Sequence, residues 1–148
     1  MEISGQQRFD ASRDVVWQML LDPSALKVAV PGCERFDEVG PQSYDLTIRV
    51  GISAIKGAYS GNVRIADATP TDSYRLIVTG SGKPGSVSGS ALMTLRDDGG
   101  GTVVTYSGDV KAQGAIARLG SRLLGGTAKL MIGQFFKSME KQVAAQAA

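Results

Sequence analysis

The sequence of 148 residues contains no histidine. Histidine is the commonest general base of enzymes and the commonest side-chain ligand of metal ions. Its absence excludes the Ser–His and Cys–His pairs on which many nucleophilic enzymes depend. Three aspartates near a glycine triplet, Asp97, Asp98 and Asp109, lack the alternating spacing of a calcium loop. We therefore expect no metal and no covalently attached cofactor.

Cysteine and long apolar segments are equally scarce. Cys33 is the only cysteine, so no internal disulfide can form and nothing indicates an oxidising compartment. The first eight residues lack the apolar segment of a secretory signal. The longest uncharged stretch is the twelve residues between Lys83 and Arg96, shorter than the roughly 20 apolar residues of a transmembrane helix. We expect a cytoplasmic protein.

Positive charge is concentrated toward the C-terminal end. The chain has 16 lysines and arginines against 14 aspartates and glutamates, a net charge of +2. Residues 110–148 carry six positive charges and one negative charge, which leaves the first 109 residues with a net charge of −3. This distribution predicts an anionic partner or surface. Nucleic acid is not expected, because aromatic residues make up only 6% of the chain and no run of five basic residues occurs.

The length and composition fit one globular domain that spans residues 1–148. Residues 3–9 are expected to form a strand. Ser12 is placed to cap a helix that runs to Leu21. Asp22-Pro23 ends that helix, because the residue before a proline disfavours helical geometry. A short helical turn is expected over residues 24–27.

The middle of the chain alternates between apolar and polar residues with the period of a β-strand. The alternating runs are residues 44–50, 55–65, 74–79, 86–96 and 104–110, with Ile77 out of phase. Turn-forming residues separate them at 40–41, 69–72, 84–85 and 97–101. The pattern predicts an antiparallel meander with one apolar and one polar face.

Glycine is over-represented, at 19 of 148 residues, against about 7% in an average protein. Several glycines share the apolar face of the predicted strands: Gly57, Gly61, Gly80, Gly89 and Gly108. Glycine within a strand marks a bend or the close approach of another group. We expect a strongly curved sheet. The missing side chains either serve curvature alone or also leave a cavity for an apolar ligand.

Residues 115–145 have helical composition, with glycines as the only residues against it. At about 100° per residue, one side gathers Ile116, Leu119, Leu123 and Leu130. The side roughly opposite gathers Arg118, Arg122 and Lys129. Beyond Gly133 the apolar side moves to Ile132, Phe136, Met139 and Val143. Either the helix is kinked at its glycines or it presents a second apolar strip elsewhere. We expect a bent or interrupted helix over the concave sheet. The result is an α+β, helix-grip fold with about seven strands wrapped around a long C-terminal helix.

Residues 80–85 spell Gly-x-Gly-x-x-Gly, the pattern of a dinucleotide-binding loop. Such a loop needs a helix after the glycines, because the helix N-terminus holds the pyrophosphate. Here the residues that follow alternate as a strand, and Pro84 lies inside the motif. A hairpin connection is therefore the better interpretation.

Several short segments carry a resemblance that covers nearly the whole chain. They are Leu21-Asp22-Pro23, Pro31-Gly32-Cys33-Glu34, Gly80-Ser81-Gly82, Gly85-Ser86-Val87-Ser88-Gly89, Gly120-Ser121-Arg122-Leu123 and Gln134-Phe135-Phe136. In this order they resemble the CoxG-like family, named after the G-subunit of carbon monoxide dehydrogenase, within the START-like (SRPBCC) superfamily of helix-grip proteins. The resemblance implies a non-catalytic accessory protein that helps to recruit a molybdenum hydroxylase, such as carbon monoxide dehydrogenase, to the inner face of the cell membrane. It also implies a hydrophobic cavity for an isoprenoid quinone or a lipid.

The predicted cavity lies between the concave sheet and the last helix. Its candidate ligand-binding residues are Tyr44, Leu46, Tyr59, Leu76, Val87, Met93, Tyr106, Leu119, Leu123, Met131 and Phe135. The tyrosine hydroxyls are suited to hydrogen-bond a carbonyl head group. The candidates for docking to an anionic bilayer or an acidic enzyme surface are Arg118, Arg122 and Lys129. The residues leave two other functions open: a cyclase or hydrolase that uses the same cavity, and an assembly subunit without a ligand.

Overall fold

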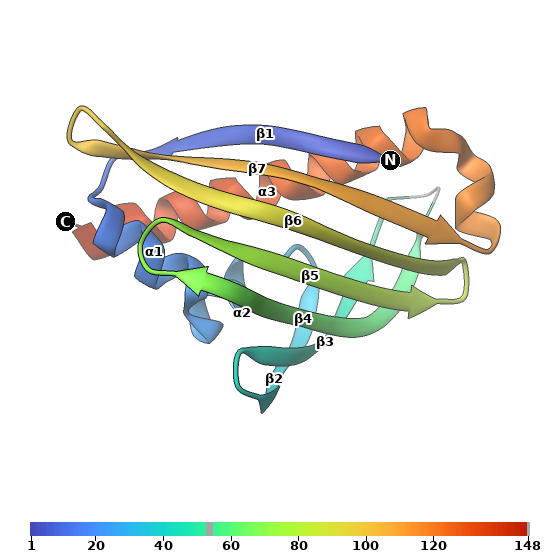
Figure 1. The fold of residues 1–148 in the computed structure, drawn as a ribbon. Helices are drawn as coiled ribbons and strands as arrows, with labels where there is room; N and C mark the ends of the chain where they lie inside the picture. Colours follow the sequence, from blue (N-terminus) through green and yellow to red (C-terminus); the bar gives the residue numbers. More distant parts are fainter. Residues whose placement is uncertain (53–54, 148) are drawn as a thin grey trace.

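A curved antiparallel sheet and one long helix make up most of the computed structural model, which describes residues 1–52 and 55–147 (Figure 1). In chain order the elements are β1 (Glu2–Phe9), α1 (Arg13–Leu21), α2 (Pro23–Ala29), β2 (Cys33–Gly40), β3 (Ser43–Val50), β4 (Gly57–Thr69), β5 (Ser73–Gly82), β6 (Gly85–Asp98), β7 (Gly101–Gln113), the 3₁₀ helix η2 (Ala115–Leu119) and α3 (Gly120–Ala147). The seven strands lie in the order β1-β7-β6-β5-β4-β3-β2. This arrangement confirms the predicted helix-grip fold.

Two short helices follow the first strand, and each of them begins at a side chain that caps its N-terminus. The Oγ atom of Ser12 accepts a hydrogen bond from the backbone N–H of Val15, which opens α1. Asp22 ends α1 and caps α2, since its carboxylate accepts from the N–H of Ser24 at 3.0 Å. The predicted helical turn over 24–27 is therefore the centre of a longer helix, α2.

Strand β2, at the edge of the sheet, is the one described strand that the apolar–polar alternation of the sequence did not predict. Most of its side chains are exposed, and charged residues replace the polar–apolar alternation of the other strands. Within it, the guanidinium of Arg35 forms an ion pair with Asp37 at 2.7 Å. Charged side chains on an edge strand discourage pairing with other chains, which explains this composition.

The inner face of the sheet carries a diagonal line of glycines. Each glycine is displaced by two residues from the one on the neighbouring strand, in the order Gly5 on β1, Gly108 on β7, Gly89 on β6 and Gly80 on β5; Gly61 on β4 then lies directly opposite Gly80. A Cβ atom on Gly108 would overlap the carbonyl oxygen of Ser90. The backbone thus approaches closely at Gly108 and likewise at Gly61, and the predicted curvature of the sheet is confirmed.

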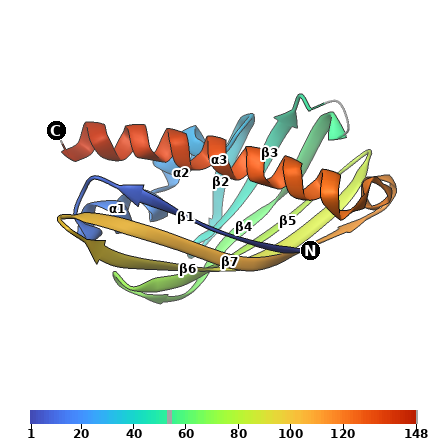
Figure 2. The same ribbon diagram turned by 90° about the horizontal axis from the view of Figure 1, so that it is seen from above.

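The interior is divided into two apolar clusters. The larger, which we call the main core, centres on Phe9, Leu20, Tyr74, Met139 and Val143 and is packed beneath the C-terminal half of α3. The smaller, which we call the second cluster, consists of Val50, Ile55, Tyr59 and Ile116 near η2. Figure 2 shows α1 and α2 close to the C-terminal half of α3, with the N-terminal half crossing the sheet alone. Side chains thus fill the fold more completely at one end.

The last helix is interrupted, as predicted, but its first turns face the other way. Gly120 has φ of +82° and separates η2 from α3, so the helical phase set by Ile116 does not continue. As a result Leu123 and Leu130 lie on the outer side and are 46% and 50% exposed. The apolar side that the sequence pattern gives to residues 116–130 is therefore not the inner face at these two leucines. The buried residues Phe136, Met139 and Val143 set the phase of α3 instead.

Candidate ligand-binding cavity

A cavity of about 640 Å³ lies between the inner face of the sheet and the roof formed by η2 and the N-terminal half of α3. Its apolar lining is supplied by Met1, Leu46, Ile48, Val50, Ile55, Tyr59, Val78, Val87, Val110, Ala112, Ile116, Ala117, Leu124, Ala128 and Met131. The volume is within the range of about 300–1,000 Å³ that is usual for small-molecule sites.

Small residues on both walls create this volume. Gly61 and Gly80 form part of the floor, and a Cβ atom on Gly80 would meet no atom within 4 Å. The roof contributes Ser121, Thr127 and Ala128 at the positions of α3 that face the sheet. Val78 is 38% exposed although it points inward from the sheet, because the space in front of it is empty.

Two of the hydroxyls near the cavity already have partners. The hydroxyl of Tyr59 donates a hydrogen bond to the carbonyl oxygen of Ile55 at 2.6 Å, and that of Thr127 donates to the carbonyl oxygen of Leu123 at 3.0 Å. Burial raises the pKa of Tyr59, which keeps this phenol neutral. The hydroxyl oxygen of Tyr59 can therefore still accept a hydrogen bond from a ligand, but its proton is already donated to Ile55.

Few ionisable side chains line the described part of the cavity. Its lining in the described part of the chain contains Lys111 and Tyr59 but no aspartate or glutamate. Nor do the described residues contain a group of three side chains suited to hold a metal ion. Proton transfer to a bound molecule would need a donor and an acceptor within hydrogen-bond reach. The mostly apolar arrangement is suited to holding an apolar molecule.

Comparison with known proteins identifies the family. Residues 5–144 match the model of the CoxG family, described as the G-subunit of carbon monoxide dehydrogenase. The chain belongs to the CoxG family. A crystal structure of a conserved protein from Geobacillus kaustophilus is similar to this CoxG-family chain throughout, with a TM-score of 0.95 and 32% sequence identity over 100% of this chain and 98% of that one. No match was found among curated proteins.

More distant structures share the CoxG-family fold. A START superfamily protein from Mycobacterium smegmatis has a TM-score of 0.77 at 10% identity, with 98% of each chain covered. A protein from Thermus thermophilus has a TM-score of 0.73 at 14% identity, with 100% of each chain covered. At such low identity the likeness establishes the START-like, helix-grip fold and nothing more specific.

Four of the predicted ligand-binding residues line the cavity: Leu46, Tyr59, Val87 and Met131. Five others are part of the main core or pack against it: Tyr44, Leu76, Met93, Tyr106 and Phe135. The four strand residues lie on the inner face, as predicted, but beneath the packed half of α3, to which Phe135 itself belongs. Their role in binding a ligand stays a prediction.

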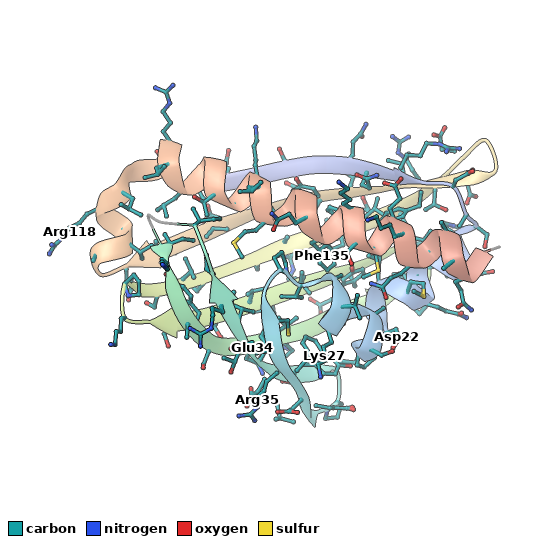
Figure 3. All side chains as sticks on the ribbon, turned by 180° about the vertical axis from the view of Figure 1, so that it is seen from behind. Asp22, Lys27, Glu34, Arg35, Arg118 and Phe135 are labelled. Carbon is teal, nitrogen blue, oxygen red and sulfur yellow. The ribbon has the colours of Figure 1, made fainter. Side chains whose placement is uncertain are left out.

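Aromatic contacts show how three of these five positions are filled. The ring of Tyr44 stacks on Phe36, with centroids 5.0 Å apart, and the ring of Tyr106 stacks on Phe136 at 5.6 Å. Phe135, labelled in Figure 3, meets Phe136 edge-on at 5.3 Å. Stacked aromatic rings occupy this end of the fold, so the cavity is confined to the other end.

Two predicted residues of the helical segment, Leu119 and Leu123, need correction. Leu119 packs at the margin of the second cluster and is not among the residues that line the cavity. Leu123 points away from the sheet, because the break at Gly120 shifts the phase of α3. The neighbouring Leu124 takes the inward position that was expected of Leu123.

The sequence reasoning missed most of the lining. Ile48 and Val50 share the alternation of Leu46, and Val78 and Val110 are in phase with neighbouring lining residues, so period two alone could have named them. Leu124 and Ala128 could not have been named in this way, because their inward orientation depends on where α3 restarts.

The three predicted docking residues are exposed. Arg118 belongs to η2 and projects away from the molecule in Figure 3, while Arg122 and Lys129 lie on α3. None of them forms an ion pair with another residue in the described ranges. Among the described helices, none combines the length and the hydropathy of a transmembrane span.

Proposed function

We propose that this CoxG-family protein binds a long apolar molecule with a carbonyl-bearing head group, either an isoprenoid quinone or a lipid. It would serve as a non-catalytic accessory protein of a molybdenum hydroxylase, such as carbon monoxide dehydrogenase, and help to couple that enzyme to the membrane. The observation that carries this proposal is the cavity of about 640 Å³, whose lining is mostly apolar.

The apolar lining would supply most of the affinity. Burying a methylene group contributes about 0.8 kcal/mol, so an isoprenoid chain gains free energy with each unit that leaves water. Polar residues at the margin, including Lys111, Gln113 and Ser121, offer donors to a carbonyl oxygen. A molecule with one polar end and a long apolar body matches this distribution.

Three further observations support an accessory role. The absence of histidine from the sequence and of carboxylates from the described lining disfavours a cyclase or hydrolase in this cavity. The family description names a component of carbon monoxide dehydrogenase, and the family's association with that enzyme supplies the proposed partner. The exposed bases at the end of the cavity roof, Arg118 and Arg122, suit an anionic surface.

The test is to purify the protein without detergent, extract it with organic solvent, and analyse the extract by mass spectrometry and ultraviolet absorption. The expected result is a quinone or lipid at a molar ratio approaching that of the protein. Protein that is already empty should then bind added menaquinone or ubiquinone saturably. A clean extract together with no saturable binding of either quinone or of phospholipid would overturn the proposal.

A further inference from the structure

The beginning of α3 contains a repeat that the cavity does not fully explain. Ser121-Arg122-Leu123-Leu124 is followed seven residues later by Ala128-Lys129-Leu130-Met131. Both heptads also place a glycine at their sixth position, as Gly126 and Gly133. Seven residues are close to two helical turns, so equivalent positions of the two heptads share a face.

The repeat gives the helix apolar residues on two sides. Leu124 and Met131 face inward and line the cavity. Leu123 and Leu130 face outward, 46% and 50% exposed, and lie about 10.5 Å apart along the helix axis. Figure 3 views the molecule from the side of α3, and no described element covers this outer side. A helix that only closed its own core would be expected to carry polar residues there.

The charges around the two outer leucines are of one sign. Arg122 and Lys129 directly precede the two leucines in the sequence. Lys137 lies seven residues after Leu130, on the same side of the helix as that leucine. All three bases are exposed and form no ion pair with any described residue. Glu140 is the only acidic residue of α3, and its carboxylate accepts a hydrogen bond from Gln7 on β1 at 2.9 Å. The outer leucines therefore lie within a positive field.

We propose that this surface, formed by Leu123 and Leu130 with Arg122 and Lys129, docks the protein on an anionic lipid bilayer. The two leucines enter the head-group region, and the two bases meet lipid phosphates, as in amphipathic helices that lie in the plane of a membrane interface. The inference rests on the proposed function, because it names the surface through which that function meets the membrane.

The size of the apolar surface favours a bilayer over a protein. A specific protein interface usually buries at least about 1,000 Å² around a continuous apolar centre. Here the exposed apolar surface consists of two separated leucines. The nearby Gly126 and Gly133 have no side chains that could extend it. Each leucine can enter a fluid interface independently, with no complementary pocket needed. The docked helix would then also be the roof of the cavity, which places the ligand one helix away from the lipid.

The experiment is flotation of the full chain with vesicles of phosphatidylcholine and phosphatidylglycerol, and with vesicles of phosphatidylcholine alone. The wild type should float with the anionic vesicles only, and added salt should release it as the charges are screened. The double variant Leu123→Gln, Leu130→Gln should lower the partition coefficient about tenfold or more, since two apolar side chains no longer enter the interface. The variant Arg122→Gln, Lys129→Gln should lower it to a similar degree.

Leu92→Gln is the matched control, because Leu92 is 41% exposed but lies on the outer face of the sheet, away from α3. It should float like the wild type. Circular dichroism verifies that each variant is folded. Wild-type protein that ignores anionic vesicles, or leucine variants that bind them as well as Leu92→Gln, would overturn the proposal, even if the same surface bound an acidic protein. Quinone binding measured without vesicles is a separate readout, so loss of docking alone leaves the ligand-binding proposal in place.

Discussion

Gly61 on β4 and Gly80 on β5 are direct partners across the sheet, yet only Gly80 has room for a side chain. A Cβ atom on Gly61 would overlap the carbonyl oxygen of Thr79, whereas a Cβ atom on Gly80 would meet nothing within 4 Å. The first glycine permits the bend of the sheet, and the second leaves empty space in the cavity floor. The two roles expected of inward glycines, curvature and cavity, are therefore divided between neighbours.

This division predicts opposite effects of the same substitution. Gly61→Ala should lower the free energy of unfolding by about 1–3 kcal/mol, because the added methyl group forces the strands apart. Gly80→Ala should raise it by about 0.4–1 kcal/mol, because alanine restricts the unfolded chain and fits the folded one. Urea denaturation of both variants measures the difference. Equal destabilisation by the two would contradict the assignment.

Glycines of the cavity roof should also differ according to backbone geometry. Gly120 has φ of +82° and ψ of 157°, a region that is essentially restricted to glycine. Gly133 lies within α3, and a Cβ atom there would meet nothing within 4 Å. Gly133→Ala should therefore stabilise the protein by about 0.5–1 kcal/mol, while Gly120→Ala should cost about 1–3 kcal/mol. Thermal unfolding separates them, and stabilisation by Gly120→Ala would show that η2 and α3 are not divided there.

The phase of α3 has its own test. Met139 is completely buried and Leu130 is 50% exposed. Met139→Ala should cost about 2–5 kcal/mol, as expected for a large buried side chain, and Leu130→Ala should change stability by no more than about 0.5 kcal/mol. Chemical denaturation provides both values. A cost at Leu130 that approached the cost at Met139 would mean that Leu130 is buried, on the same apolar side as Ile116 and Leu119, and would contradict the observed phase of α3.

Most of the fold could be predicted because local patterns and tertiary packing agree. Period two located the central strands, the turn residues located the hairpins, and Asp22-Pro23 separated the two short helices. Edge strand β2 was missed because it does not alternate between apolar and polar residues. Its charged side chains instead discourage pairing with other chains at the sheet edge.

The candidate site was less predictable, for a different reason. Leu46 and Met93 both point inward from the sheet, but Leu46 meets empty space and Met93 meets the main core. Which of these applies depends on how closely α3 approaches each end of the sheet. The distance between α3 and the sheet is set by α1, α2 and the break at Gly120. The residue pattern within one strand therefore cannot predict it.

Alkaline pH should weaken the fold through Tyr74. Burial raises the pKa of this phenol well above its ordinary value. The folded state therefore disfavours the tyrosinate, and the stability that the neutral ring provides is lost as pH rises above the unfolded value of about 10. Between about pH 10 and 11 the loss should approach 1.4 kcal/mol per pH unit, and Tyr74→Phe should reduce that slope. Urea denaturation across this range measures it; an unchanged slope would contradict the argument.

The central claim is that the cavity beneath the N-terminal half of α3 holds an apolar ligand, and a titration of menaquinone into paired variants tests it most directly. Gly80→Leu places a side chain in the open floor, and Ser81→Leu places the same side chain on the exposed outer face of the same strand. Accommodating the extra leucine around a ligand should cost about 1–3 kcal/mol, so the Kd of Gly80→Leu should rise about 10- to 100-fold. Ser81→Leu should bind like the wild type. If the wild type binds menaquinone and Gly80→Leu binds it equally well, the ligand does not occupy this cavity and the account is contradicted.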